Sequence, residues 1–433
     1  MSEMMKRVYV ETYGCQMNKH DAERIAGLLQ AVGYVAELDV TKADLAVYYT
    51  CCVRKSADER FYGQLSSVKH KEGSIIAVGG CLAQDKGEEL LKRFKKIDVV
   101  FGTQNLKELP TFINQLNGQS ISDTQYLKEF NSNLPALREL KHKAWVAVNR
   151  GCDNHCSYCI VPTVRGPEVS RAIEDIETEI DQLVADNVKE VTLLGQNVNS
   201  YGKDIYSRPS FSKLLDTLGK KDINRVRFTT SHPKDLSDEI LETISENENM
   251  CEHIHLPFQA GSDRVLRKMG RQYNKEGYLE LVKMIRNYLP DASITTDIMV
   301  GFPTEDEKDF EDTLDIVENA RFDKAFTFIY SKRDGTPAAS LEDNVAYEDK
   351  LERFKRLVSL QDEISLEKNK ENVGRVEELL VDSITKKDRA MLSGRTKTNK
   401  LVHFKGEAST IGSFVNVKIK EAKPFFLIGE ISG

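Results

Sequence analysis

The sequence has no run of about 18 apolar residues, which is the length an α-helix needs to cross a bilayer. It also has no internal repeat and no low-complexity segment. Its first residues, MSEMMKRVYV, lack the apolar region of a secretory signal peptide. These absences predict a soluble, cytoplasmic protein with no membrane partner.

The chain also lacks an overall basic charge, since 61 Lys and Arg stand against 68 Asp and Glu. A net charge of −7 does not favour nucleic-acid binding by the molecule as a whole. The segment from Asn369 to the end, however, holds 12 Lys and Arg against 8 Asp and Glu. Because phosphate contacts are local, this segment is compatible with RNA binding, although a solvated charged face explains the same composition.

A length of 433 residues suggests about three domains. Strand-like and helical runs alternate in 1–112, which predicts a parallel α/β sheet, and the polar segment 113–138 is typical of a linker. Strand–helix units fill 139–368 and predict a partial (β/α)6 barrel. Short strands in 369–433 predict a small β-barrel. The predicted fold class is therefore α/β, with strands of the central barrel at 145–148, 190–194, 226–229, 253–256, 293–299 and 325–330.

The clearest motif is a cysteine cluster, Cys152-x3-Cys156-x2-Cys159, directly after the predicted strand 145–148. Three neighbouring thiolates can bind one [4Fe–4S] cluster, which takes four ligands. The fourth iron would then stay open for a substrate or cofactor. The spacing differs from the paired cysteines of zinc ribbons, and a structural zinc with His155 as fourth ligand is the alternative.

A second set of cysteines is dispersed in the sequence: Cys15, Cys51 and Cys81 each follow the end of a predicted strand. Carboxyl ends of parallel strands lie at one edge of a sheet, where such sheets bind ligands. Gly14 allows the chain to turn back sharply there. We therefore expect a second cluster on these three cysteines, the alternative being that they are buried small hydrophobic residues.

The remaining cysteines, Cys52 and Cys251, fit neither set. We interpret both as structural, with Cys52 as a potential substitute for Cys51.

A CxxxCxxC motif after the first strand of an α/β barrel resembles the radical-SAM superfamily. In that superfamily the open iron binds S-adenosylmethionine (SAM), and the reduced cluster cleaves it to a 5′-deoxyadenosyl radical. The resemblance implies cofactor contacts near the carboxyl ends of barrel strands. The candidates are Gly195, Gln196, Asn197, Asp297 and Val300, together with His232, Gln259 and Ser262, which could equally serve the fold.

Nearly the whole chain resembles the methylthiotransferase family. The matching segments include Tyr13–Asn18, Gly80–Gln84 and Phe101–Asn105, and the C-terminal part, with Gly394–Thr396, is similar to the RNA-binding TRAM domain. The family implies two [4Fe–4S] clusters, with SAM as both methyl donor and radical source. A radical route suits C2 of a purine, whose C–H bond is not acidic.

Branches of this family differ in their substrate. Segments 193–202, 228–238 and 251–266 resemble the branch that converts N6-isopentenyladenosine to its 2-methylthio derivative at tRNA position 37. The other branches act on threonylcarbamoyl-adenosine in tRNA or on ribosomal protein S12. One departure is Tyr49-Thr50-Cys51-Cys52, where the first branch usually has Asn-Thr-Cys-Ser, and it leaves the environment of the second ligand open.

The implied partner is the anticodon loop of tRNA, because a base can leave its stack more easily in a loop. An electron donor such as flavodoxin or ferredoxin and a sulfur source would also be needed. Two other functions remain open, a single-cluster radical-SAM methylase and a non-catalytic iron–sulfur RNA-binding sensor. The candidate RNA contacts, each of which could be an ordinary surface charge, are Lys386, Lys387, Arg389, Arg395, Lys397 and Lys400.

Overall fold

The N-terminal part is a parallel sheet with the strand order β2-β1-β3-β4-β5-β6. The structure, a computed structural model, describes residues 5–52, 55–127, 129–386 and 388–432. The strands are β1 (Lys6–Thr12), β2 (Tyr34–Ala36), β3 (Leu45–Thr50), β4 (Ile75–Gly80), β5 (Val99–Phe101) and β6 (Ile121–Asp123). Their helices are α1 (Gln16–Ala31), α2 (Lys55–Ser67), α3 (Cys81–Lys86), α4 (Glu88–Arg93) and α5 (Leu109–Gln115).

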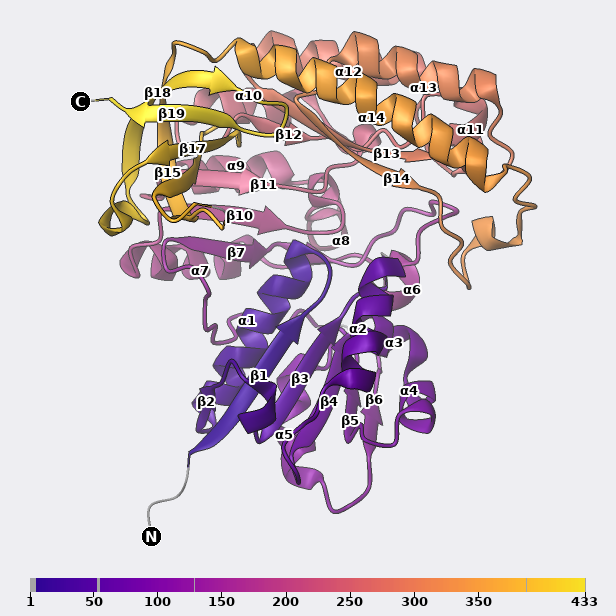
Figure 1. Ribbon diagram of the computed structural model, residues 1–433, viewed down its shortest axis with the longest axis vertical. Coiled ribbons are helices and arrows are strands. Elements are labelled where there is room, and N and C mark those ends of the chain that lie inside the picture. The colour runs from indigo at the N-terminus through magenta and orange to yellow at the C-terminus, as the bar shows by residue number, and fades with distance from the viewer. Residues whose placement is uncertain (1–4, 53–54, 128, 387, 433) are drawn as a thin grey trace.

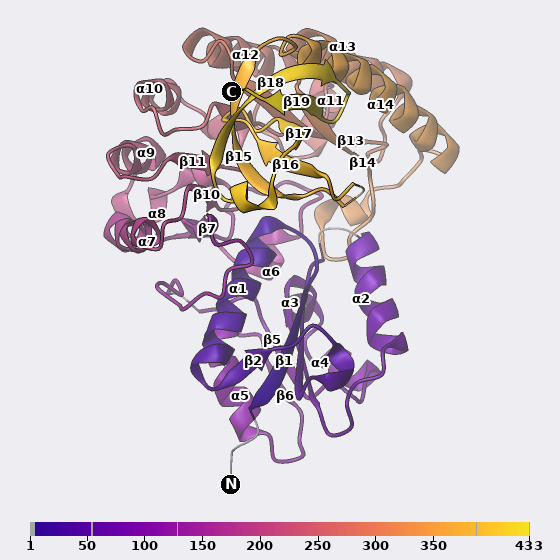
Figure 2. The ribbon, with the colours of Figure 1, turned by 60° about the vertical axis from the view of Figure 1, so that its left-hand side comes forward.

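Strand β3 is buried along its whole length because helices cover both faces of the sheet. Helices α1 and α5 pack on one face, and α2, α3 and α4 pack on the other (Figure 2). The carboxyl ends of β1 and β3 point toward the central part of the molecule (Figure 1). The edge that the sequence predicts to hold ligands therefore faces the rest of the chain.

The predicted linker 113–138 contains regular structure at two places. Helix α5 ends at Gln115, and residues Ile121–Asp123 form β6, which pairs in parallel with β5. A three-residue edge strand with one apolar side chain gives no alternation that a sequence pattern could reveal. The chain after β6 leads to β7 of the central part.

The central part is an open half-barrel of parallel strands (Figure 1). One sheet has the order β11-β10-β7, the other has the order β12-β13-β14, and a parallel bridge between Val226 and Met250 joins them. The strands are β7 (Lys143–Ala147), β10 (Glu190–Leu194), β11 (Arg225–Phe228), β12 (His253–His255), β13 (Ser293–Val300) and β14 (Lys324–Ile329). These positions confirm the predicted partial barrel.

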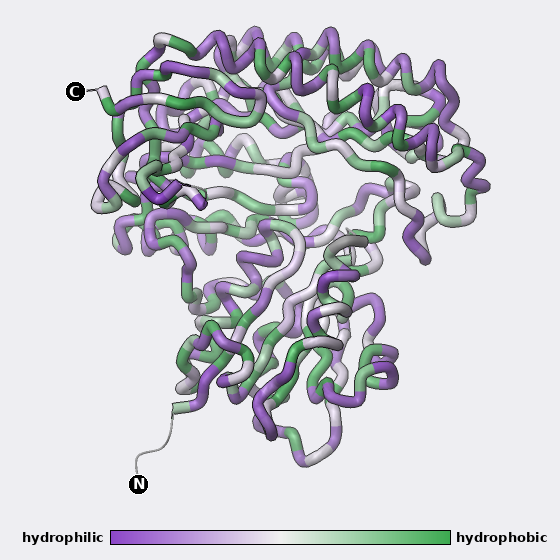
Figure 3. The backbone as a smooth tube through the Cα atoms, viewed as in Figure 1, coloured by the Kyte–Doolittle hydropathy of each residue, from purple (hydrophilic) through white to green (hydrophobic). Residues whose placement is uncertain are grey.

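Helices cover the outside of the half-barrel. They are α7 (Ile173–Ala185), α9 (Phe211–Gly219), α10 (Asp238–Glu246), α12 (Lys275–Tyr288), α13 (Glu307–Ala320) and α14 (Tyr347–Lys370). Shorter elements lie in the loops: β8 (Asn149–Arg150), α6 (Val161–Arg165), β9 (Val169–Ser170), α8 (Lys203–Tyr206) and α11 (Asp263–Lys268). Along the outer helices hydrophobic and hydrophilic residues alternate, as expected for helices with one face against a sheet (Figure 3).

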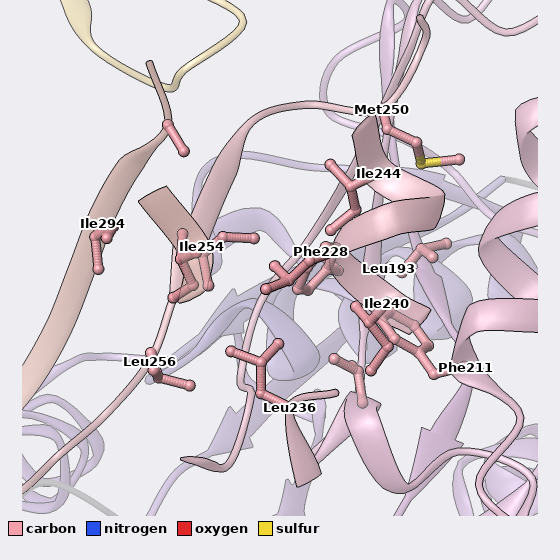
Figure 4. Packing of buried hydrophobic residues seen from close by; sticks show 14 of the residues in the cluster. Leu193, Phe211, Phe228, Leu236, Ile240, Ile244, Met250, Ile254, Leu256 and Ile294 are labelled. Atoms are coloured by element: carbon pink, nitrogen blue, oxygen red, sulfur yellow. The ribbon is translucent and has the colours of Figure 1, made fainter. Parts of the chain in front are cut away.

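The main core lies between the barrel strands and these helices. Leu193 and Phe228 on the strands pack with Ile240 of α10 and Phe211 of α9 (Figure 4). The rings of Phe211 and Phe228 meet edge to face with centroids 5.2 Å apart. Burying each such side chain contributes about 1.5–3 kcal/mol, so this layer holds the strands on which the site is built.

The C-terminal part is a closed barrel with the strand order β15-β16-β17-β19-β18. Its strands are β15 (Val376–Ile384), β16 (Met391–Arg395), β17 (Leu401–Lys405), β18 (Phe414–Ala422) and β19 (Leu427–Ile431). It confirms the predicted small β-barrel. The barrel lies at the amino ends of β7, β10 and β11 (Figures 1 and 2), which is the end opposite to the loops that carry Cys152 and its neighbours.

Two buried arginines at the start of β11 bind the C-terminal barrel through its backbone. Arg225 donates to the carbonyl oxygen of Arg395 at 2.9 Å. Arg227 donates to the carbonyl oxygens of Thr396 and Lys397 at 2.6 and 2.7 Å. The barrel is therefore docked by specific hydrogen bonds rather than tethered loosely.

Buried ion pairs complete this contact. Glu190 lies 2.9 Å from Arg227 and 3.0 Å from Lys143, and Lys143 lies 2.6 Å from Asp382 of the barrel. Burial alone would raise the pKa of Glu190, but Arg227 and Lys143 outweigh it and lower that pKa to about 2. Glu190 is therefore a stable anion between two cations.

We expect Glu190→Gln to destabilise the protein by about 3 kcal/mol, because it leaves the buried cation Arg227 without its carboxylate partner, while Lys143 keeps Asp382. Thermal unfolding should show a lower melting temperature. The matched control is Glu430→Gln, which removes an exposed carboxylate paired with Lys420 at 3.0 Å on the same barrel. That change should cost no more than about 1 kcal/mol. Equal melting temperatures for the two variants would contradict the role of Glu190.

Within the described residues, none of the helices combines the length and the apolar composition of a membrane span.

Candidate metal centres and cofactor site

The first cysteine set lies in the loop between β8 and α6, beyond the carboxyl end of β7. Cys152, Cys156 and Cys159 are each partly buried. The sulfur of Cys152 accepts from the backbone N–H of Asn154 at 3.4 Å, and the sulfur of Cys156 accepts from Arg271 at 3.4 Å. Burial raises the pKa of Cys159 to about 12. The protein therefore supplies hydrogen-bond donors to two of the three sulfurs.

The residues that follow β10 contact the backbone just before this loop. The Gln196 side-chain oxygen accepts from the backbone N–H of Gly151 at 2.6 Å. A Cβ on Gly195 would lie 1.8 Å from the side-chain oxygen of Asn149, so glycine is required at this approach. Gly195 and Gln196 thus reach the residues directly before Cys152.

Several buried polar atoms at this end lack a hydrogen-bond partner within the described structure. They include the side-chain oxygens of Asn149 and Asn197 and the hydroxyl of Ser231. Buried polar groups are normally paired, so an unpaired group needs an explanation. These atoms lie at the carboxyl ends of β7, β10 and β11, where they could serve a polar ligand such as the amino acid part of SAM.

His232 follows β11 and is neutral in this environment. Burial, with the charge of Arg271 as a second cause, lowers its pKa to about 2. Its Nδ1 accepts from the backbone N–H of Lys234 at 3.2 Å, and its ring meets Tyr273 edge to face at 5.9 Å. His232 is therefore placed for neutral contacts, consistent with either predicted role.

Two further candidates, Asp297 on β13 and Gln259 after β12, lie next to each other. Asp297 keeps 31% of its side-chain surface exposed and lies 3.6 Å from His255. Gln259 adopts a left-handed backbone with φ 69°, and its N–H donates to the carbonyl of Asp297 at 2.9 Å. The backbone of Gln259 thus belongs to the sheet, which brings these two residues together.

Ser262 and Val300 have side chains that serve the fold, a role that the sequence analysis left open for Ser262. The Ser262 hydroxyl donates to Asp309 at 2.5 Å and caps α11 by accepting from Val265 N–H. The side chain of Val300 is fully buried in the main core. Contacts of these two residues with the cofactor stay a prediction.

The second cysteine set gathers at one edge of the N-terminal sheet. Cys15 precedes α1, Cys51 directly follows β3, and Cys81 begins α3 after β4. Register pairs Thr12 with Tyr49 and Thr50 with Gly80, so the three strands end side by side. The predicted meeting of strand ends is thus present in the structure.

Gly14 brings the first two cysteines of this set together. It has φ +104°, and a Cβ there would lie 2.4 Å from the Cβ and 2.7 Å from the sulfur of Cys51. The Asn18 side chain fastens the same turn, because it donates to the carbonyl oxygens of Tyr13 and Thr50 at 2.7 and 2.8 Å. The residues that precede Cys15 and Cys51 are therefore held by one amide.

The pKa of the Cys81 thiol is lowered, whereas the pKa values of the Cys15 and Cys52 thiols are raised. A hydrogen bond with Cys52 is the largest cause that lowers the pKa of Cys81 to about 6, and the charge and hydrogen bond of Arg165 add to it. Cys51, Cys52 and Cys81 are buried, whereas Cys15 is exposed. The structure thus places Cys52 against Cys81, while Cys251 is buried far along the chain beside Arg227.

Two arginines, Arg165 and Arg271, reach the cysteine sulfurs, which the sequence analysis did not predict. No spacing rule could have found Arg271, because it lies 115 residues from Cys156. Arg165 had a weak signal in the sequence, as it follows Cys159 closely, but its direction depends on how the two sheets face each other.

The donor sets fit iron–sulfur clusters better than single ions. Among the described residues, no three His, Cys, Asp or Glu side chains converge on one metal ion. A structural zinc with His155 needs such convergence, so the structure does not support it. In a [4Fe–4S] cluster each cysteine binds a different iron, so the thiolates surround the cluster instead of meeting at one point.

The predicted RNA contacts differ in their exposure. Lys400 lies 2.6 Å from Asp323 of the central part and is largely buried, so its side chain holds the barrel in place. Lys397 and Arg395 are partly exposed, with Lys397 4.0 Å from Glu252 of the central part and Arg395 3.8 Å from Asp382 of the barrel itself. Lys386 and Arg389 are exposed, and Lys387 lies outside the described residues.

Gly14→Ala should remove about half of the iron from the anaerobically reconstituted protein, because the added Cβ would displace Cys51. Iron analysis per chain measures this. Gly33→Ala is the matched control, since Gly33 has a similar φ of +91° and nothing within 4 Å of the added Cβ. Both changes carry backbone strain of about 1–3 kcal/mol. Equal iron content in the two variants would show that the contact with Cys51 does not matter.

Known families match all three parts of the chain. Residues 146–317 match the radical SAM superfamily, residues 370–432 match the TRAM domain, and residues 7–102 match the uncharacterized protein family UPF0004.

The fold is similar to a solved radical S-adenosylmethionine methyltransferase, TsrM from Kitasatospora setae. The TM-score is 0.55 at 13% identity, covering 78% of this chain and 74% of that one. A second structure of TsrM gives 0.56 at 14% identity, covering 77% and 75%. The central fold with its cysteine loop is thus that of a radical-SAM protein.

Full-length relatives define the family further. A tRNA-2-methylthio-N(6)-dimethylallyladenosine synthase of Thermoanaerobacter pseudethanolicus is 48% identical, over 98% of this chain and 92% of the relative. That of Natranaerobius thermophilus is 45% identical over 98% and 97%, and one of Clostridium botulinum is 46% identical over 98% and 96%. The chain belongs to this family of radical-SAM methylthiotransferases.

Proposed function

We propose that this protein converts N6-dimethylallyladenosine, also called isopentenyladenosine, to its 2-methylthio derivative at tRNA position 37. The observation that carries the proposal is the pair of cysteine sets. Each lies at the carboxyl edge of its own parallel sheet, in a chain that matches relatives of this name along 98% of its length. The domains would be 1–112 for the second cluster, 139–368 for radical chemistry and 369–433 for RNA, with 113–138 between them.

Each cysteine set would hold one [4Fe–4S] cluster. Cys152, Cys156 and Cys159 would bind the cluster that works with SAM, and Cys15, Cys51 and Cys81 would bind the auxiliary cluster. When bound, these groups supply a radical able to act on an unactivated C–H bond and a sulfur atom for transfer, chemistry that side chains lack. A second SAM would supply the methyl group.

The chain's own residues would bind SAM and orient the cysteine loop. The unpaired oxygens of Asn149 and Asn197 lie at the end of the barrel that would receive SAM, and neutral His232 follows β11 at the same end. Arg271 donates to Cys156 and so orients the loop that follows β8.

The tRNA would enter with its base out of the stack, as enzymes that modify bases require. Lys386 and Arg389 on the C-terminal barrel are exposed candidates for phosphate contacts, and Arg395 and Lys397 are partly exposed ones. A low-potential electron donor such as flavodoxin or ferredoxin and a sulfur source would complete the cycle. Because tRNA is the substrate, we place the reaction in the cytoplasm.

Four substrates offered to the reconstituted enzyme with SAM and a reductant test this function. They are tRNA with N6-dimethylallyladenosine, the same tRNA with unmodified adenosine, tRNA with threonylcarbamoyl-adenosine, and ribosomal protein S12. Nucleoside and peptide mass spectrometry should find the methylthio group only with the first. Product on the third or fourth substrate would reassign the protein to another branch. SAM consumption without any methylthio product would favour a methylase, and no SAM cleavage would favour a sensor.

A further inference from the structure

Arg165 connects the two cysteine sets. It ends α6, the short helix that begins two residues after Cys159, and only 7% of its side chain is exposed. Its guanidinium leaves the central part of the molecule and enters the N-terminal part. There it donates to the side-chain oxygen of Asn18 at 2.8 Å and to Asp21 at 3.2 Å.

The partners of Arg165 are themselves fixed. The hydroxyl of Tyr49 donates to the same oxygen of Asp21 at 2.9 Å, and His20 lies 3.1 Å from the other oxygen. Asn18 is the amide that holds the carbonyls of Tyr13 and Thr50, next to the turn before Cys15 and directly before Cys51. The guanidinium therefore has one position, set by residues of the auxiliary edge.

Arg165 also acts on the sulfurs of that edge. It hydrogen-bonds the Cys81 thiol, and its charge acts on Cys15 as well. The anionic groups and potential anions that face it are Asp21, Tyr49, Cys15 and Cys81, and the charge of Arg150 also acts on it. A cluster bound to three thiolates carries negative charge, which this cation would offset.

The backbone of α6 is anchored in the same way. Thr103 donates its hydroxyl hydrogen to the carbonyl of Val164 at 3.0 Å, and Gln104 donates to the carbonyl of Arg165 at 3.1 Å. Tyr126 donates to the carbonyl of Thr163. The end of α6 is thus bound to the N-terminal part by its backbone and its last side chain, while its start is tied to Cys159.

We propose that Arg165 is a positioning residue of the auxiliary site, which holds the Cys81 sulfur and offsets the charge there, and which sets the separation of the two cysteine sets through α6. This inference rests on the proposed function, because it needs an auxiliary cluster. Hydrogen bonds to cluster sulfurs and nearby charge both tune the reduction potential of a cluster. Arg271 occupies a comparable position at the other set, where it donates to Cys156.

The test uses the full chain with Cys152, Cys156 and Cys159 all replaced by alanine, so that only the auxiliary cluster remains. Arg165→Met and Arg165→Lys are made in this background and reconstituted anaerobically. Iron per chain and the midpoint potential of the cluster, followed by electron paramagnetic resonance, are the readouts. We expect Arg165→Met to lower the midpoint potential and Arg165→Lys, which keeps the charge without the planar fork, to lower it less.

Arg24→Met is the matched control. Like Arg165, Arg24 is a buried arginine that links the two parts. It belongs to α1 of the N-terminal part and pairs with Glu179 of α7 in the central part. No cysteine is among its recorded partners in the described structure. The control should leave the potential unchanged, and an equal shift with Arg24→Met would overturn the inference in favour of general domain docking.

Each remaining outcome of this test either supports or overturns the inference about Arg165, or overturns the two-cluster proposal. Full iron and an unchanged potential in both Arg165 variants would overturn the inference. Loss of iron in either variant supports it when the apoprotein keeps its melting temperature, and overturns it when the melting temperature falls as well, since Arg165 would then be only structural. If the parent triple variant binds no iron at all, the two-cluster proposal fails instead.

Discussion

Replacing Cys152, Cys156 and Cys159 together with alanine should reduce SAM cleavage by more than about a thousandfold, because enzymes typically accelerate reactions by about a millionfold or more. The three thiols are the proposed ligands of the cluster that works with SAM, and no neighbouring side chain offers the same donor. Formation of 5′-deoxyadenosine under reducing conditions, measured by chromatography, reports the loss. Methylthio product on tRNA should disappear with it.

Cys251→Ala is the control for this first prediction. Cys251 is buried at the contact with the C-terminal barrel and belongs to neither cysteine set. Its replacement should lower stability slightly and leave SAM cleavage within a few-fold of wild type. Retained cleavage in the triple variant would mean that the radical chemistry does not depend on this loop.

Replacing Cys81 alone should separate the two activities. We expect Cys81→Ala to keep SAM cleavage within about threefold of wild type and to lose methylthio product entirely, because the auxiliary edge would supply the sulfur. The first cysteine set lies on a different element, in the loop before α6, so its cluster should remain. Parallel assays of 5′-deoxyadenosine and of modified nucleoside measure the separation.

Cys52→Ala provides the comparison, because Cys52 lies against the same Cys81 thiol. If Cys52 is structural, this variant should keep both iron and product. If it loses the product while a Cys51→Ala variant keeps it, Cys52 is the ligand and Cys51 is not. Equal loss of SAM cleavage in Cys81→Ala would instead argue that the two cysteine sets form one functional site.

Much of the fold could be predicted because strands of a parallel sheet are continuous apolar runs. The predicted strand 190–194 matches β10 at both ends, and the predicted central strands lie within two residues of those observed. The dispersed cysteines could be grouped for the same reason, since each follows such a run. The short strands β2 and β6 escaped prediction because three residues at a sheet edge carry too little pattern.

The details of the site depend on contacts between distant segments. Lys400 looked like a surface charge, yet it lies against Asp323, which is 77 residues away in the sequence. Arg165 lies 144 residues from Asp21, and no pattern in either segment predicts that the two side chains pair. Such pairs form only when separate parts of the fold pack against each other, so local composition and periodicity do not predict them.

The most direct test of the account is the iron and acid-labile sulfide content of anaerobically reconstituted protein. Wild type should hold about eight irons per chain, as expected for two four-iron clusters. The triple variant of Cys152, Cys156 and Cys159 and the triple variant of Cys15, Cys51 and Cys81 should each hold about four. A wild-type content of about four irons that falls to none in the first variant would contradict two separate sites.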